Sequence, residues 1–195
     1  MRVVATKPLG CYGDGGAVFT DDDNIADIVR SLRVHGKGTH KYDNVRIGMN
    51  SRLDTIQAAI LIEKLNIFPE EIKKRNAVAK RYNAALSDVA VTPTLIDGAT
   101  SVWAQYTLCV ENREELMGCL KASDIPSVVY YPRPLHLQTA YKDYPISPDG
   151  LPVCVELSGK VLSLPMHPYL DTVTQDRVID AFHSATRSVA AQETL

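Results

Sequence analysis

Residues 7–20 read KPLGCYGDGGAVFT. Lys7 stands just ahead of four glycines within the seven residues 10–16, and an apolar segment follows them. Glycine lets the backbone adopt positive φ angles and come close to a ligand. A tight turn between two strands needs glycines as well, so the residues alone are compatible with a ligand site and with a plain turn.

The overall composition is that of an ordinary globular protein. The chain has 195 residues, 45% of them hydrophobic and 23% charged, and its net charge is −2. These values exclude a disordered or collagen-like chain, and the near balance of basic and acidic residues disfavours a nucleic-acid partner. The longest uncharged run, 98–110, is too short to span a membrane. We expect a cytoplasmic protein without a membrane partner or a secretory signal.

The cysteines and histidines do not form a metal-binding pattern. The four cysteines are widely spaced and include no C-x-x-C pair, which disfavours a zinc site and a disulfide framework. His35 and His40 are five residues apart, with no carboxylate at ligand spacing. We therefore expect no metal.

The hydrophobic pattern divides the chain near residue 87. Before this point we expect two short strands, a helix capped by Asp21 and Asp22, a loop over 34–50 that is functional or disordered, and two longer helices separated at Pro69. After it we expect a smaller α+β part with a largely non-regular, proline-rich stretch over 126–168. The predicted strands are 2–5, 17–20, 89–92, 102–110 and a short one at 127–131, and the predicted helices begin at 21–22, 51–54, 69, 112 and 172.

Four strings in fixed order resemble one known family. The stretch 7–20 closely resembles the cofactor-lysine region of the DegT/StrS-type nucleotide-sugar aminotransferases, which belong to the aspartate-aminotransferase class (fold type I) and use pyridoxal phosphate. The other strings are RVHG (33–36), IGMNSRLDTIQAA (47–59) and YPRPLHLQ (131–138). They cover nearly the whole chain but only about the C-terminal half of a typical family member. The resemblance implies an α/β fold, with part of the large cofactor domain and linking helices at 1–87 and a small α+β domain at 88–195.

The resemblance also assigns roles to five residues. Lys7 is implied to bind pyridoxal phosphate covalently, because only a primary amine forms a Schiff base that a substrate amine can displace, and then to transfer a proton as base and acid. Asn50 is implied to bind the cofactor phosphate, and Arg52 an anionic substrate group, both in the site of a neighbouring protomer. Tyr131 and His136 are implied to contact the sugar, the nucleotide or the diphosphate. Judged without the resemblance, the last four are more often ordinary surface or structural residues.

These roles predict a transamination that depends on pyridoxal phosphate and acts on a keto-sugar nucleotide, with glutamate as the amino donor. The strings 47–59 and 131–138 most resemble enzymes that make 3-amino sugars on UDP-linked N-acetylhexosamine uronates. We therefore expect a role in amino-sugar and polysaccharide biosynthesis. A homodimer is expected because the family site is shared between protomers.

The chain departs from the family pattern because the family's N-terminal half is not part of it. That half supplies an aromatic residue stacked on the cofactor ring, an aspartate that pairs with the pyridine nitrogen, and several phosphate ligands, and without the aspartate the electron sink is weak. Two alternatives stay open: a truncated, non-catalytic module that dimerises or pairs with a separate N-terminal half, and a sugar-nucleotide dehydratase relative. Lys7 argues against the dehydratase, because such relatives place histidine there.

Overall fold

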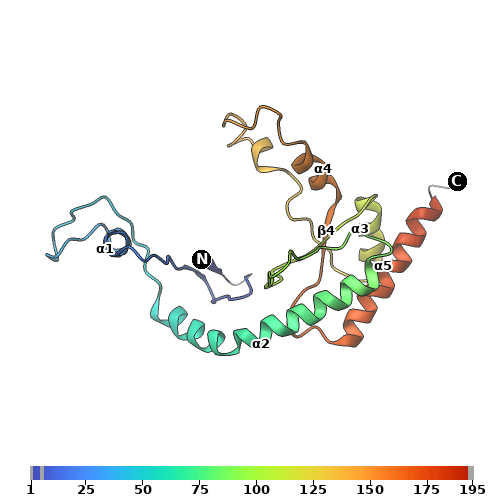
Figure 1. The fold of residues 1–195 in the computed structure, drawn as a ribbon, viewed down its shortest axis with the longest axis horizontal. Coiled ribbons are helices and arrows are strands. Elements are labelled where there is room, and N and C mark those ends of the chain that lie inside the picture. Colours follow the sequence, from blue (N-terminus) through green and yellow to red (C-terminus); the bar gives the residue numbers. More distant parts are fainter. Residues whose placement is uncertain (1, 5–6, 193–195) are drawn as a thin grey trace. The chain divides into compact units, whose positions relative to one another are not determined.

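The chain forms two compact units in the computed structural model, residues 1–69 and 70–195. The structure describes residues 2–4 and 7–192. Figure 1 shows the elements in chain order. They are β1 (Arg2–Val4), β2 (Asp14–Gly16), α1 (Asp23–Leu32), α2 (Thr55–Leu86), β3 (Tyr106–Cys109), α3 (Arg113–Ala122), the 3-10 helix η1 (Leu135–Leu137), α4 (Pro152–Lys160), β4 (Val161–Leu164) and α5 (Thr172–Gln192).

The first unit begins with a two-stranded antiparallel ribbon. β1 pairs with β2, with Arg2 opposite Gly16 and Val4 opposite Asp14. The first strand confirms the prediction for 2–4, and Ala5 lies outside the described residues. The prediction of a strand at 17–20 is wrong, because the strand that pairs with β1 is Asp14–Gly16 in the glycine-rich segment itself, and 17–20 is not a strand.

The helix α1 and the loop after it are held by local hydrogen bonds. The Asp22 carboxylate caps α1 as predicted, accepting from the backbone N–H groups of Asn24 at 2.8 Å and Ile25 at 3.1 Å. The loop 34–50 is ordered, with backbone bridges such as the one that joins Val34 to Asn50.

Two glycines allow this loop to close on itself. A Cβ atom on Gly48 would lie 2.1 Å from the backbone nitrogen of Gly36, and a Cβ atom on Gly36 would lie 1.8 Å from the carbonyl oxygen of Arg46. Gly36 also has a φ of +74°, in the left-handed region that glycine favours. Both positions therefore require glycine.

α2 is one continuous helix, and the prediction of two helices separated at Pro69 is wrong. Pro69 has no N–H, so it removes a single hydrogen bond to the carbonyl four residues earlier, while the Glu and Lys residues that follow it favour helix. The last turns bury Val78, Tyr82 and Leu86 in the core of the second unit. The division between the compact units therefore falls at Pro69, and the family domains predicted at 1–87 and 88–195 stay a prediction.

The second unit has a large apolar core. β3 and β4 pair antiparallel, with Tyr106 opposite Leu164 and Cys109 opposite Val161, and α3 packs against α5. The predicted strand at 102–110 is shorter than expected, because only 106–109 pairs with β4. The largest fully buried side chains of this core are Tyr82, Leu86, Tyr106, Leu108, Leu116, Leu120, Leu162, Gln175 and Phe182.

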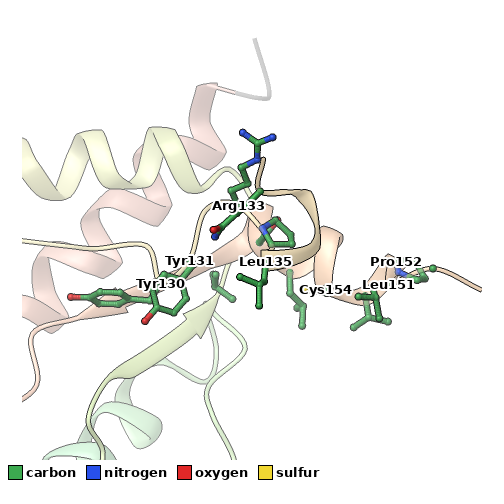
Figure 2. Close-up of a pocket in the computed structure, with 14 residues that line it drawn as sticks. Tyr130, Tyr131, Arg133, Leu135, Leu151, Pro152 and Cys154 are labelled. Atoms are coloured by element: carbon green, nitrogen blue, oxygen red, sulfur yellow. The ribbon is translucent and has the colours of Figure 1, made fainter. Parts of the chain in front are cut away.

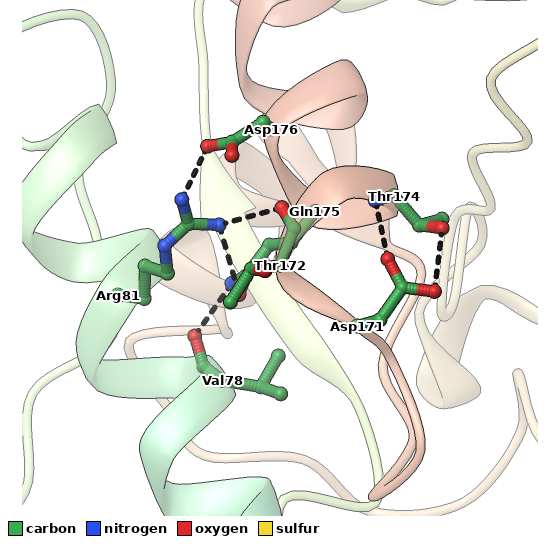
Figure 3. Close-up of polar contacts among 7 residues, drawn as sticks. All are labelled: Val78, Arg81, Asp171, Thr172, Thr174, Gln175 and Asp176. Carbon is green, nitrogen blue, oxygen red and sulfur yellow. Dashed lines mark hydrogen bonds and ion pairs between the residues drawn. The ribbon is translucent and has the colours of Figure 1, made fainter.

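A buried amide links α2 to α5, as Figure 3 shows. Gln175 Nε2 donates to the carbonyl oxygen of Val78 at 2.8 Å, and the Gln175 side chain is almost fully buried. Arg81 donates to the carbonyl oxygen of Thr172 at 3.1 Å and forms an ion pair with Asp176. α5 is therefore fixed on α2 near its first turn.

Residues 126–168 contain more regular structure than predicted. η1, α4 and β4 all fall in this stretch, and Val128 pairs with Ser163 in an isolated bridge. Proline is confined to positions that these elements tolerate, such as Pro152 in the first turn of α4.

Candidate functional site

The loop that carries Lys7 is packed onto α2. The Lys7 side chain is exposed. Two and four residues further on, Leu9 and Cys11 are buried, and Leu61 and Phe68 of α2 pack against them. The loop is therefore fixed by its apolar residues while the amine stays open to solvent.

A hydrogen bond fixes the same loop a second time. The backbone N–H of Tyr12 donates to Gln57 Oε1 at 2.7 Å, and Gln57 lies in the first turn of α2. A Cβ atom on Gly13 would lie 3.4 Å from Gln57 Nε2, an ordinary contact distance, so the Gln57 side chain packs beside the backbone at position 13.

Asn50 and Arg52 lie together just before α2. Arg52 Nε donates to Asn50 Oδ1 at 3.1 Å, and both side chains are exposed. Among the described residues, no hydrogen bond or ion pair occupies Asn50 Nδ2 or the terminal guanidinium nitrogens of Arg52. These donors can therefore bind an anionic group.

Within the described residues, Asn50 and Arg52 are the only two of the predicted site residues that share a hydrogen bond. In the described part of the chain, no hydrogen bond or ion pair joins Lys7 to Asn50 or Arg52. The prediction that the pair acts in a neighbouring protomer's site stays a prediction.

The second unit contains a cavity of about 940 Å³ between the η1 loop and α4, shown in Figure 2. Its size is within the range of small-molecule sites. The lining is largely apolar, and its residues include Tyr130, Tyr131, Arg133, Leu135, Pro152 and Leu157.

Tyr131 and His136 are placed differently with respect to this cavity. Tyr131 lines it, and its ring contacts the Tyr130 ring edge-on, with 5.8 Å between the centroids. His136 is half-buried within η1 and is not among the lining residues. Their predicted contacts with substrate stay predictions.

Sequence reasoning missed the wall of the cavity that α4 provides. Pro152 at the start of the helix, Lys160 at its end, and Val153 and Leu157 four residues apart are signals of a short helix. The high proline content of the surrounding residues concealed these signals.

Two buried tyrosines of the second unit have altered pKa values. Burial raises the pKa of Tyr82 and Tyr106 above their usual range. The Tyr82 hydroxyl donates to the carbonyl oxygen of Pro165 at 3.1 Å, and the Tyr106 hydroxyl donates to Asn83 Oδ1 at 2.5 Å. These two tyrosines therefore have a structural role in the core of the second unit.

The described residues provide neither a cluster of metal ligands nor a membrane-spanning helix. No group of three or more His, Cys, Asp or Glu side chains among them could hold a metal ion. None of the helices that the structure describes has the length and apolar character needed to cross a membrane.

Comparison with known families gives one match that covers most of the chain. The sequence model of the DegT/DnrJ/EryC1/StrS aminotransferase family matches residues 4–183.

The curated relatives include sugar aminotransferases. The UDP-2-acetamido-2-deoxy-3-oxo-D-glucuronate aminotransferase of Pseudomonas aeruginosa is 49% identical over 87% of this chain and 46% of its own length. The dTDP-3-amino-3,4,6-trideoxy-alpha-D-glucose transaminase of Micromonospora megalomicea is 40% identical over 90% of this chain and 49% of its own. The chain spans about half the length of the curated relatives it matches.

Solved structures share the fold. A DegT DnrJ EryC1 StrS aminotransferase from Brucella abortus is 56% identical, with a TM-score of 0.92 over 94% of this chain and 49% of its own. NtdA from Bacillus subtilis, solved with bound cofactor PMP, is 26% identical, with a TM-score of 0.84 over 96% of this chain and 45% of its own. The fold is therefore that of part of a sugar aminotransferase.

Proposed function

Since the chain belongs to the DegT/DnrJ/EryC1/StrS aminotransferase family, we propose that it carries the lysine-bearing half of an aminotransferase that uses pyridoxal phosphate and acts on a keto-sugar nucleotide. The observation that carries this proposal is the Lys7 loop, which is fixed to α2 by two buried apolar residues and by the bond from Tyr12 to Gln57. The reactive amine is thus held on a rigid support and is open to an aldehyde.

The substrate proposed is a UDP-linked 3-keto N-acetylhexosamine uronate. The 49% identity to the Pseudomonas enzyme supports this class. A second relative, the UDP-N-acetyl-3-dehydro-alpha-D-glucosamine 3-aminotransferase of Acidithiobacillus ferrooxidans, supports amination at carbon 3. We propose glutamate as the amino donor, and a homodimer or a separate N-terminal half as the protein partner. The proposed location is the cytoplasm.

The donor chemistry of the first unit fits pyridoxal phosphate in two respects. Lys7 offers an exposed primary amine for the aldehyde, and Asn50 offers an amide donor for the phosphate. The bound cofactor supplies an electron sink for the carbanion of the amino donor. We expect the carboxylate that pairs with its ring nitrogen to come from the half of the family fold outside this chain.

Within the reaction, the residues of this chain bind substrate and move a proton. Lys7 Nζ would move a proton from the α-carbon of the amino donor to C4′ of the cofactor in the first half of the exchange, and from C4′ to the carbon of the keto sugar in the second half. Arg52 holds an anionic group of a substrate through its free guanidinium nitrogens, while its Nε stays on Asn50. Tyr131 and His136 contact the sugar nucleotide from the second unit.

The test is covalent capture of the cofactor at Lys7. Pyridoxal phosphate added to the chain should give a visible absorption band, and borohydride reduction should leave the cofactor mass on the peptide that contains Lys7. The Lys7→Ala variant should lose both signals, whereas Lys37→Ala, which alters another exposed lysine of the first unit, should keep them. Equal labelling of wild type and Lys7→Ala would refute the assignment.

The alternative is a module without catalysis that acts by association. The many exposed apolar side chains of the first unit favour it, among them Phe19 and Ile47. Under this alternative the chain associates normally but the cofactor does not label Lys7 selectively. A dehydratase relative is disfavoured because position 7 is lysine.

A further inference from the structure

We propose that a cavity at the C-terminal end of α5 binds a free α-amino acid with an apolar side chain. The cavity has a volume of about 400 Å³ and is lined mainly by residues from the start of α3 and the last turns of α5, both in the second unit. This volume is within the range of small-molecule sites. None of the predicted site residues lines the cavity, so the inference goes beyond the proposed function.

The apolar part of the cavity wall continues the core of the second unit. Val110 and Leu116 belong to that core and also line the cavity. On α5 the stripe of buried side chains extends from Ala185 to Val189, one turn further along, and Val189 lines the cavity as well. An apolar side chain placed there would leave water and contact aliphatic groups from both helices, which favours binding.

Two opposite charges line the same cavity without neutralising each other. Glu111 comes just before α3, and Arg187 lies on α5. In the part of the chain that the structure describes, no ion pair joins these two side chains. An α-amino acid carries one charged group of each sign, so it can pair with both.

Arg187 provides the group that binds the carboxylate. Its Nη2 donates to Ser184 Oγ at 3.3 Å, which orients the side chain along α5. Its Nε and Nη1 have no hydrogen bond to any described residue. A guanidinium with free donors binds a carboxylate through charge-assisted hydrogen bonds. The Thr186 hydroxyl beside it is already used, because it donates to the carbonyl oxygen of Phe182 at 3.0 Å.

Glu111 provides the group that binds the ammonium. Its Oε1 accepts from Lys160 Nζ at 2.8 Å, and the same Lys160 nitrogen also pairs with Glu156 at 3.2 Å. One lysine therefore serves two carboxylates, and negative charge remains at this side of the cavity. Glu111 Oε2 accepts no hydrogen bond within the described residues. This oxygen can accept from the amino group of a ligand.

The charges and the apolar wall together select the class of amino acid. A carboxylic acid without an amine would bring its negative charge near Glu111 without neutralising it. Glutamate, the proposed amino donor, would place its second carboxylate against the apolar wall, and the removal of a charge from water is costly. Leucine and phenylalanine place an aliphatic or an aromatic group there instead. The ligand of this cavity therefore differs from the proposed amino donor.

The experiment titrates the whole chain with leucine or phenylalanine and follows the backbone amide signals by two-dimensional NMR. Signals of residues 110–116 and 186–190 should shift until the site is saturated, whereas signals of the first unit should not. Lys7→Ala, which removes the proposed reactive amine, should bind leucine like wild type, so the result is independent of the proposed function.

Two analogues of leucine separate the two charges of the ligand. 4-Methylpentanoate lacks the amine, and leucinamide lacks the carboxylate. Each should bind about tenfold more weakly than leucine, because one hydrogen bond between charged groups is lost.

Variants of the two charged residues test the same contacts from the side of the protein. Arg187→Gln and Glu111→Gln should each weaken leucine binding about tenfold. Arg177→Gln is the matched control and should bind like wild type, because Arg177 is an exposed arginine of the same helix that does not line the cavity. The replaced side chains are exposed, so circular dichroism of each variant should be unchanged.

The absence of saturable shifts with both amino acids would overturn the inference. Equal binding of 4-methylpentanoate and leucine would also overturn it, because the cavity would then recognise a carboxylate alone. Glutamate binding as strong as that of leucine would assign the cavity to the amino donor and would have the same effect. An affinity for leucine that is unchanged in Arg187→Gln or in Glu111→Gln would show that the cavity does not use both charges, which contradicts the inference.

Discussion

Replacing Gln175 by leucine should lower the free energy of unfolding of the second unit by about 1–2 kcal/mol. The change removes the hydrogen bond from Gln175 Nε2 to the Val78 carbonyl, and a buried hydrogen bond contributes about 0.5–1.5 kcal/mol net. It also removes Gln175 Oε1, which accepts a hydrogen bond from Arg81 Nη1 at 3.5 Å. Leucine has a similar volume, so its burial offsets part of this loss.

Asp176 provides the matched control on the next residue of α5. Its ion pair with Arg81 joins side chains that are 53% and 35% exposed. Exposed pairs of this kind contribute about 0–1 kcal/mol. Asp176→Asn should therefore cost less than Gln175→Leu.

Trp103 makes the measurement specific to the second unit. It is the one tryptophan of the sequence, and it is buried in that core. Urea unfolding followed by its fluorescence therefore reports this unit. Equal losses for Gln175→Leu and Asp176→Asn, or no loss for Gln175→Leu, would refute the view that the buried amide fixes α5 on α2.

Two further predictions concern the glycine loop and the buried tyrosines. Gly48→Ala should disrupt the loop after α1, because its Cβ would lie 2.1 Å from a backbone nitrogen; unchanged hydrogen exchange of the loop amides would contradict this. Gly118→Ala is the control, because a Cβ there meets open space. It should be neutral or stabilise α3 by up to about 1 kcal/mol, and a loss of stability in urea unfolding would contradict this. Burial raises the pKa of Tyr82 and Tyr106, so unfolded tyrosines ionise first as the pH rises above about 10. The free energy of unfolding should therefore fall as the pH rises above about 10, less steeply in Tyr106→Phe; an unchanged slope would contradict this.

Local signals in the sequence predicted the elements whose partners lie nearby. The Asp22 cap is set by bonds to residues two and three positions away, so it could be predicted without tertiary information. The continuous α2 could not, because the packing of Tyr82 and Leu86 in the second core outweighs the local effect of Pro69. In the same way α4 depends on contacts such as Arg113 with the Ser158 carbonyl, which link residues far apart in sequence.

The sequence could predict a contact within the candidate site where both residues belong to one short motif. Asn50 and Arg52 are two residues apart, and the structure joins them directly. Tyr131 was predicted as a substrate contact, but the cavity that it lines also needs α4, some twenty residues later. No spacing rule connects residues across a proline-rich segment of that length.

The bond between Gln57 and position 12 has a consequence for natural variation. The donor is a main-chain N–H, and the Tyr12 side chain itself is exposed. Any amino acid at position 12 except proline, which has no backbone N–H, can therefore donate this hydrogen bond. Gln57 has no such freedom, so among related sequences we expect an amide-bearing side chain at 57 to persist while the residue at 12 changes.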